Sequence, residues 1–215
     1  MTEKCKLFIF DLDGTLVDSV QQITNAINSA RVEGGYSTLD GLLASSLIGL
    51  PATELVADLN LINSESEKLI IRFRELLLDA IQISNHVFPG VLDFLNESRE
   101  RGILLGVATS KPDHIAQKVV ENSELNGYFF HVQGTENFPG KPNPEVIKRV
   151  LEASGSNTAI MFGDRVEDIF AASAAGIGCV GIAQGPHSKE QLDAAGAFRT
   201  YSDFNEANEI FKFHT

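Results

Sequence analysis

Cysteine is scarce in this chain of 215 residues, and the two that it has, Cys5 and Cys179, are isolated from each other. A disulfide framework or a zinc site needs several cysteines or histidines at characteristic spacings. The sequence therefore predicts neither. Internal repeats and low-complexity tracts are also lacking. A chain of this length suits one compact core with an insertion, or two small domains.

Basic residues are few as well, with 17 Lys and Arg against 29 Asp and Glu and a net charge of −12. Such a chain repels phosphate backbones and anionic lipids. No apolar run approaches the roughly 18 residues of a membrane span, and no signal peptide opens the chain. We therefore expect a soluble cytoplasmic protein, a monomer or homodimer, with no nucleic-acid or membrane partner.

One stretch near the start, Phe8–Ser19, combines a buried strand with acidic residues. The apolar run that ends at Phe10 predicts a parallel strand, and Asp11 then lies at its carboxyl end, where open α/β sheets bind ligands. Asp13 follows two residues later, which along an extended chain is roughly 6.6 Å away on the same side. Two such carboxylates can share one site.

Carboxylates this close repel each other unless a cation lies near them or one holds a proton. A Mg²⁺ ion would neutralise Asp11 and leave it a nucleophile, and a raised pKa would make Asp13 a proton donor and acceptor. The alternative is a loop with two solvated acids after a core strand.

Three further segments carry candidate site residues. Thr109-Ser110 follows an apolar strand over 103–108 and suits phosphate binding, or else a helix cap. Lys141 lies in a Pro-bounded turn, where it is either a fixed cation or an exposed lysine. Asp164 ends another apolar strand, with Asp168 four residues later; these acids fit a metal site, or serve as helix-dipole partners.

The order of secondary structure predicts two domains. Residues 18–86 show helical periodicity without a convincing strand, which is far too long for an ordinary loop. From residue 87 onward strands and helices alternate, so a parallel sheet covered on both faces is expected. We predict a catalytic core over 1–17 and 87–215, with a helical domain inserted over 18–86.

Four segments of the chain resemble the four motifs of the haloacid dehalogenase-like superfamily, in its phosphatase branch. In chain order they are DLDGTLVDS, TS, GKPNP and GDRVED. The inserted helices resemble the cap of its phosphoglycolate phosphatase-like subgroup. The resemblance implies a Rossmann-like α/β core with an all-helical cap. It also implies a phosphoric monoester hydrolase that uses Mg²⁺ and an aspartyl-phosphate intermediate, with a small phosphorylated metabolite as substrate, either phosphoglycolate or a sugar phosphate.

The resemblance also assigns roles to individual residues. Asp11 would be the nucleophile and Asp13 the acid and base. The phosphoryl group would be held by Thr109, the Ser110 N–H and Lys141. The metal would be held by Asp11, the Asp13 backbone carbonyl, Asp164 and Asp168, while the loop with Leu50 would touch the substrate.

Other functions remain open at this point. A sugar phosphomutase, similar to β-phosphoglucomutase, would share Asp11 and Asp13, but it resembles DGV more than the DGT found here. A regulatory or binding protein could use the fold without turnover, although the intact motifs argue against it. Dehalogenase activity is disfavoured because that branch usually lacks Asp13. The cationic residues of the insertion that could meet a substrate carboxylate are Arg31, Lys68, Arg72, Arg74 and His86.

Overall fold

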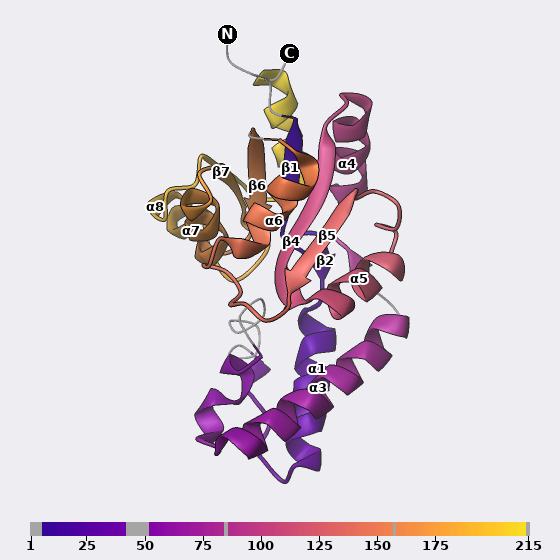
Figure 1. Ribbon diagram of the computed structural model, residues 1–215, viewed down its shortest axis with the longest axis vertical. Coiled ribbons are helices and arrows are strands. Elements are labelled where there is room, and N and C mark those ends of the chain that lie inside the picture. Colours follow the sequence, from indigo (N-terminus) through magenta and orange to yellow (C-terminus); the bar gives the residue numbers. More distant parts are fainter. Residues whose placement is uncertain (1–5, 42–51, 84–85, 157, 214–215) are drawn as a thin grey trace.

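The computed structural model describes residues 6–41, 52–83, 86–156 and 158–213. Its centre is a six-stranded sheet with the order β5-β4-β1-β6-β7-β8, in which all neighbouring strands are parallel. The strands are β1 (Leu7–Phe10), β4 (Leu104–Pro112), β5 (His131–Thr135), β6 (Ala159–Gly163), β7 (Gly178–Ile182) and β8 (Arg199–Tyr201). The predicted α/β class with a parallel sheet is confirmed (Figure 1).

Strand β1 lies in the interior of the sheet, and all four of its residues are fully buried. Successive side chains of a strand point to opposite faces, so the two faces have different cores. Phe8 and Phe10 pack on one face with Phe94, Phe162 and further aromatic rings. The opposite face of β1 belongs to a second, mostly aliphatic cluster. This double burial explains why the strand is apolar at every position.

Helices cover both faces of the sheet. The aromatic face is covered by α4 (Val91–Glu100), α5 (Asp113–Glu121) and α9 (Phe204–Ala207), which is followed by η2 (Asn208–Phe213). The aliphatic face is covered by α6 (Glu145–Ser154), α7 (Val166–Ala174) and α8 (Lys189–Ala194). Among the described residues, no helix is both long and apolar enough to cross a bilayer.

A helical insertion follows β1 in the sequence and lies beyond the carboxyl ends of the strands (Figure 1). It contains α1 (Val20–Glu33), η1 (Glu54–Leu59) and α3 (Asn63–Ile83), and α1 packs along α3. The chain enters and leaves it through a short antiparallel ribbon of β2 (Val17–Asp18) and β3 (His86–Val87). This ribbon coincides with the predicted connections, while the division into two domains stays a prediction.

Two strands differ from their predicted bounds. Strand β4 continues past Ala108 to Pro112, with an irregular register that brings Pro112 opposite Thr135. Its polar end is tolerated because the Thr135 hydroxyl donates a hydrogen bond to the Ser110 carbonyl at 2.9 Å. The aromatic run over 128–132 predicts a strand, but strand β5 begins at His131, three residues later, since pairing with β4 sets its start. Tyr128 and Phe129 lie before the strand and pack against the aromatic core instead.

Helix starts also differ in detail. Ser19, directly before the helical periodicity, is a candidate cap and does precede α1, but its hydroxyl makes no capping bond. The Asp18 carboxylate instead accepts from the Val20 N–H at 3.4 Å. Ser64, with Glu67 three residues later, predicts a capping box, but helix α3 begins at Asn63, so Ser64 lies inside the first turn. The sequence also predicts a short helix over 39–47, but most of that segment, together with Leu50, lies outside the described residues.

Candidate active site

Asp11 and Asp164 lie close together because the strands that precede them are neighbours in the sheet. Strand β1 lies between β4 and β6, so Asp11 and Asp164 both follow at the same carboxyl edge of the sheet. The Asp11 N–H continues the pairing with a hydrogen bond to the Phe162 carbonyl at 2.9 Å. The predicted position of both acids is therefore where the topology places them.

Asp11, Asp164 and Asp168 form a cluster in which one carboxylate oxygen of each lies within 4.8 Å of the others. All three side chains are buried. The Thr15 hydroxyl donates to Asp164 Oδ1 at 2.7 Å and fixes that carboxylate. A Cβ at Gly185 would collide with Asp164, so only glycine fits there. We call these three acids the carboxylate cluster.

Lys141 inserts its ammonium into the carboxylate cluster. Its Nζ lies 2.6 Å from Asp11 Oδ1 and 2.5 Å from Asp168 Oδ1, and it donates to the Ala108 carbonyl at 3.1 Å. The side chain is buried, which rules out the exposed turn lysine. Burial alone would lower the pKa of Lys141, but attraction by Asp11 and then Asp168 outweighs burial and raises it. Lys141 therefore stays charged.

The cluster nevertheless keeps a surplus of negative charge, because three carboxylates face one ammonium. Burial raises the pKa of Asp11 to about 6, although Lys141 acts in the opposite direction. Burial, with repulsion from Asp168 and Asp11, raises the pKa of Asp164 well above its ordinary value. A divalent cation among these oxygens would relieve that repulsion, and oxygen donors suit Mg²⁺. The residues present thus fit a hard metal ion.

Asp13 is separate from the carboxylate cluster and faces a cavity. Its Oδ2 lies 3.0 Å from Lys111 Nζ, and both side chains are buried. Its Oδ1 is buried without a hydrogen bond from the described residues. The sequence analysis missed Lys111 because β4 was expected to end at Ala108. In the longer strand Lys111 follows Thr109 by two residues, a spacing that becomes informative only once pairing with β5 extends β4 past Ala108.

The two hydroxyl residues of β4 hold the site together. Thr109 is buried, and its Oγ1 accepts a hydrogen bond from the Lys111 N–H at 3.3 Å. Ser110 Oγ accepts from the Lys141 N–H at 3.1 Å. Helix α5 begins only at Asp113, so neither residue is a helix cap. Ser110 links the strand to the turn that carries Lys141.

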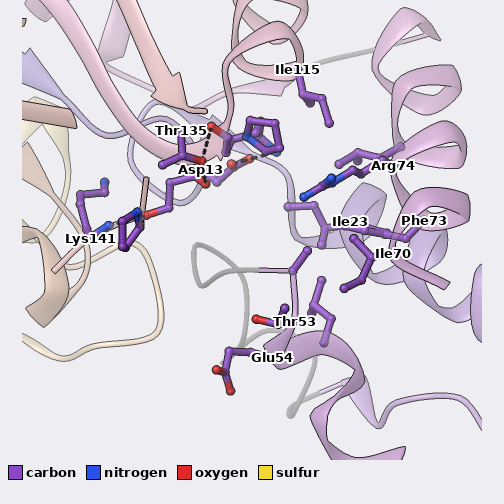
Figure 2. Close-up of a pocket in the computed structure, with 18 of the residues that line it drawn as sticks. Asp13, Ile23, Thr53, Glu54, Ile70, Phe73, Arg74, Ile115, Thr135 and Lys141 are labelled. Carbon is purple, nitrogen blue, oxygen red and sulfur yellow. Dashed lines mark hydrogen bonds and ion pairs between the residues drawn. The ribbon is translucent and has the colours of Figure 1, made fainter. Parts of the chain in front are cut away.

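A cavity of about 720 Å³ lies between the sheet edge and the helical insertion. Asp13, Ser110 and Lys141 line its sheet side. Lys141 also contacts Asp11 and Asp168, so it connects the cavity wall to the carboxylate cluster. Figure 2 shows Ile23, Phe73 and other side chains of the insertion facing Asp13 across the cavity. The volume falls in the usual range for small-molecule sites.

One expectation about exposure was wrong. The positions of Arg165 and Glu167 between the two acids of the fourth motif predict exposed side chains, but Arg165 is only 5% exposed. Its Nε lies 3.2 Å from Glu167 Oε2, and its backbone N–H donates to Asp168 Oδ2 at 3.0 Å. The pairing within the first turn of α7 folds the side chain back over the helix start, instead of extending it into solvent.

Known proteins are similar to this chain in sequence and in fold. Residues 8–182 match the family model described as haloacid dehalogenase-like hydrolase. The chain belongs to the haloacid dehalogenase-like hydrolase family. It is 31% identical over 221 residues to a phosphoglycolate phosphatase of Rhodospirillum rubrum, which covers 97% of this chain and 91% of the relative. It is 27% identical to a 5'-nucleotidase of Pseudomonas aeruginosa, covering 96% and 95% of the two chains.

Solved structures of this hydrolase family confirm the fold. A haloacid dehalogenase-like hydrolase from Streptococcus pneumoniae superposes with a TM-score of 0.86 at 25% identity, covering 96% of this chain and 98% of the other. The helical insertion is included in that coverage. The overall fold is therefore that of a haloacid dehalogenase-like hydrolase along nearly the whole chain.

Proposed function

We propose that this protein is a Mg²⁺-dependent phosphatase that hydrolyses a small phosphate monoester through an aspartyl-phosphate intermediate. Its family and its phosphatase relatives make it a phosphoric monoester hydrolase. The single observation that carries the finer proposal is the geometry of Asp11, which is buried against Lys141 and two further acids, with Asp13 two residues away.

In the first step, an Asp11 oxygen attacks phosphorus in line, and the ester P–O bond breaks as the new P–O bond forms. Asp13 gives a proton to the departing alkoxide. Its Oδ1, buried and without a hydrogen bond among the described residues, is the atom that would carry this proton. Thr109, the Ser110 N–H and Lys141 would hold the phosphoryl oxygens, and Lys141 would balance their charge.

In the second step, water attacks the phosphorus of the aspartyl-phosphate while Asp13 takes a proton from that water. The bond between phosphorus and the Asp11 oxygen breaks, which releases inorganic phosphate and restores the carboxylate. Asp13 thus ends the cycle with the proton that it gave up in the first step. One residue serves both steps because both protons move at the same side of the phosphoryl group.

The oxygen atoms that would hold Mg²⁺ belong to Asp11, Asp164, the Asp13 backbone carbonyl and the phosphate, with Asp168 supporting them. When bound, the ion would neutralise charge on the carboxylates and on the phosphoryl group. The surplus of negative charge in the carboxylate cluster supports this assignment. Phosphoglycolate and sugar phosphates are the proposed substrates, and the cytoplasm is the proposed location.

The test is release of inorganic phosphate from a generic aryl phosphate, with and without Mg²⁺. We expect turnover with Mg²⁺, none in excess chelator, and recovery when Mg²⁺ is restored. The Asp164→Ala variant should need more Mg²⁺ for half-maximal rate, since it loses one oxygen ligand. Full activity in chelator would contradict the proposed metal dependence.

A further inference from the structure

The cationic side chains of the helical insertion have different surroundings, although the sequence alone does not separate them. Arg31 is fully buried, and its guanidinium pairs with the Asp58 carboxylate through two contacts of 2.8 Å. It also donates to the Ser37 and Leu55 carbonyls. Arg72 pairs with Glu33 at 2.6 Å and with Glu75 at 3.0 Å on the surface. Both arginines are therefore occupied by the protein itself.

Arg74 is different, because it lines the cavity and has no partner among the described residues. Its Nε is buried and receives no hydrogen-bond acceptor from the residues that the structure describes. Ile70, Phe73 and Leu77 of the same helix are buried and also line the cavity. Figure 2 shows the side chain extending from α3 across the cavity toward the side where Asp13 lies. A buried N–H without an acceptor is costly, so this position favours a ligand that supplies one.

Three of the other charged residues that line the cavity are paired within the protein. Lys111 pairs with Asp13, and Lys141 pairs with Asp11 and Asp168. Glu167 pairs with Arg165. Glu54 also lines the cavity, but it is exposed, and Figure 2 shows its carboxylate pointing away from Arg74. In the described part of the chain, Arg74 is thus the cavity-lining cation left without a counter-charge.

We propose that Arg74 binds a second anionic group of the substrate, so that the natural substrate is a phosphate monoester that also carries a carboxylate or a second phosphate. This inference rests on the proposed phosphatase function and narrows its substrate class. A guanidinium is always charged and presents paired N–H donors that match the two oxygens of such a group. Arg74 would act in specificity, since it lies on the insertion and not at the reacting phosphorus.

Matched substrate pairs test the proposal. Phosphoglycolate is compared with hydroxyethyl phosphate, phosphoglycerate with glycerol phosphate, and a sugar bisphosphate with its monophosphate. In each pair only one member has the second charge, and the pairs separate a carboxylate from a phosphate. In at least one pair, we expect the native enzyme to favour the member with the second anionic group. The expected ratio of kcat/KM is about 10- to 100-fold, the range for hydrogen bonds to a charged group.

Three variants locate the effect. Arg74→Gln should abolish the preference, while changing kcat/KM far less for the member that lacks the second charged group. Arg74→Lys, which keeps the charge but not the paired donors, should keep part of it. Arg72→Gln is the matched control, an arginine on the same helix that is paired on the surface and does not line the cavity. It should leave the preference unchanged.

Binding in the Asp11→Asn background separates the two proposals. Calorimetry with phosphoglycolate and hydroxyethyl phosphate measures the same preference without turnover. A preference lost in Asp11→Asn/Arg74→Gln but kept in Asp11→Asn/Arg72→Gln supports the subsite, even if the native enzyme hydrolysed nothing and the phosphatase proposal failed. Turnover without preference in any pair, or a preference that survives Arg74→Gln, would overturn the role of Arg74 and leave the phosphatase proposal intact.

Discussion

The sheet edge and the helical insertion hold their charged residues in different ways. At the sheet edge, Asp11, Asp168 and Lys141 are buried and in contact with one another. In the insertion, Arg72 is paired on the surface, while Arg74 lines the cavity with no partner in the described part of the chain. A site whose charged groups are buried and held against one another by the fold suits chemistry common to many substrates. A cation left without a partner suits a group that only some substrates have.

The largest expected effect on turnover comes from a substitution at the sheet edge. Asp11→Asn keeps the size of the side chain but removes the nucleophile, so turnover of every phosphate ester should fall by roughly 10⁴-fold or more. The rate of phosphate release measures this. Asp93→Asn, an exposed acid in the first turn of α4, is the control and should retain full activity. Near-normal turnover by Asp11→Asn would remove Asp11 from the mechanism.

Asp13→Ala is expected to have the next largest effect. Loss of proton transfer should lower kcat by about 10²–10⁴-fold for alkyl phosphates. The loss should be smaller for aryl phosphates, whose leaving groups need little help. A series of esters with leaving groups of graded pKa measures the difference. An equal loss across the series would contradict the role of Asp13 as the acid.

The pH dependence of the free energy of unfolding tests the burial of charge at the sheet edge without a catalytic assay. The pKa of Asp11 is raised to about 6 from an ordinary value of 3.8, so the folded state holds its proton more tightly than the unfolded state. Stability from this group is present at low pH and is lost as pH rises from about 4 to about 6. The metal-free protein should therefore lose up to about 3 kcal/mol relative to Asp11→Asn across that range.

Denaturant unfolding of both proteins in chelator, at several pH values, measures this difference. Added Mg²⁺ should reduce it, because a bound cation favours the ionised carboxylate. A difference between the two proteins that does not change with pH would show that burial does not perturb Asp11 in this way.

A smaller effect is expected inside the insertion. Arg31→Met removes charge-assisted hydrogen bonds to Asp58 and to two carbonyls, so the free energy of unfolding should fall by roughly 1.5–3 kcal/mol. Arg72→Gln, which loses surface pairs only, should change it by about 0–1 kcal/mol. Thermal or denaturant unfolding measures both. Equal losses would show that burial does not distinguish the two arginines.

The sequence predicted the sheet edge well because its residues follow apolar strands. A run such as Leu7–Phe10 fixes both the strand and the position of Asp11 after it. Lys111 was missed since its position depends on how far β4 pairs with β5, a long-range property that the local pattern does not contain. Arg74 could not be separated from Arg31 or Arg72 because each lies on or beside an amphipathic helix. Only the packing of the helices decides which one faces the cavity.

The central claim, that Asp11 is the nucleophile, is tested most directly by mass spectrometry of Asp13→Ala protein quenched with acid during turnover of an aryl phosphate. With Asp13 absent, the second step should slow more than the first for such a good leaving group, so the phosphorylated enzyme should accumulate. The account predicts a phosphoryl adduct on the peptide that contains Asp11, and none when Asp11→Asn is added. An adduct on any other residue would contradict it.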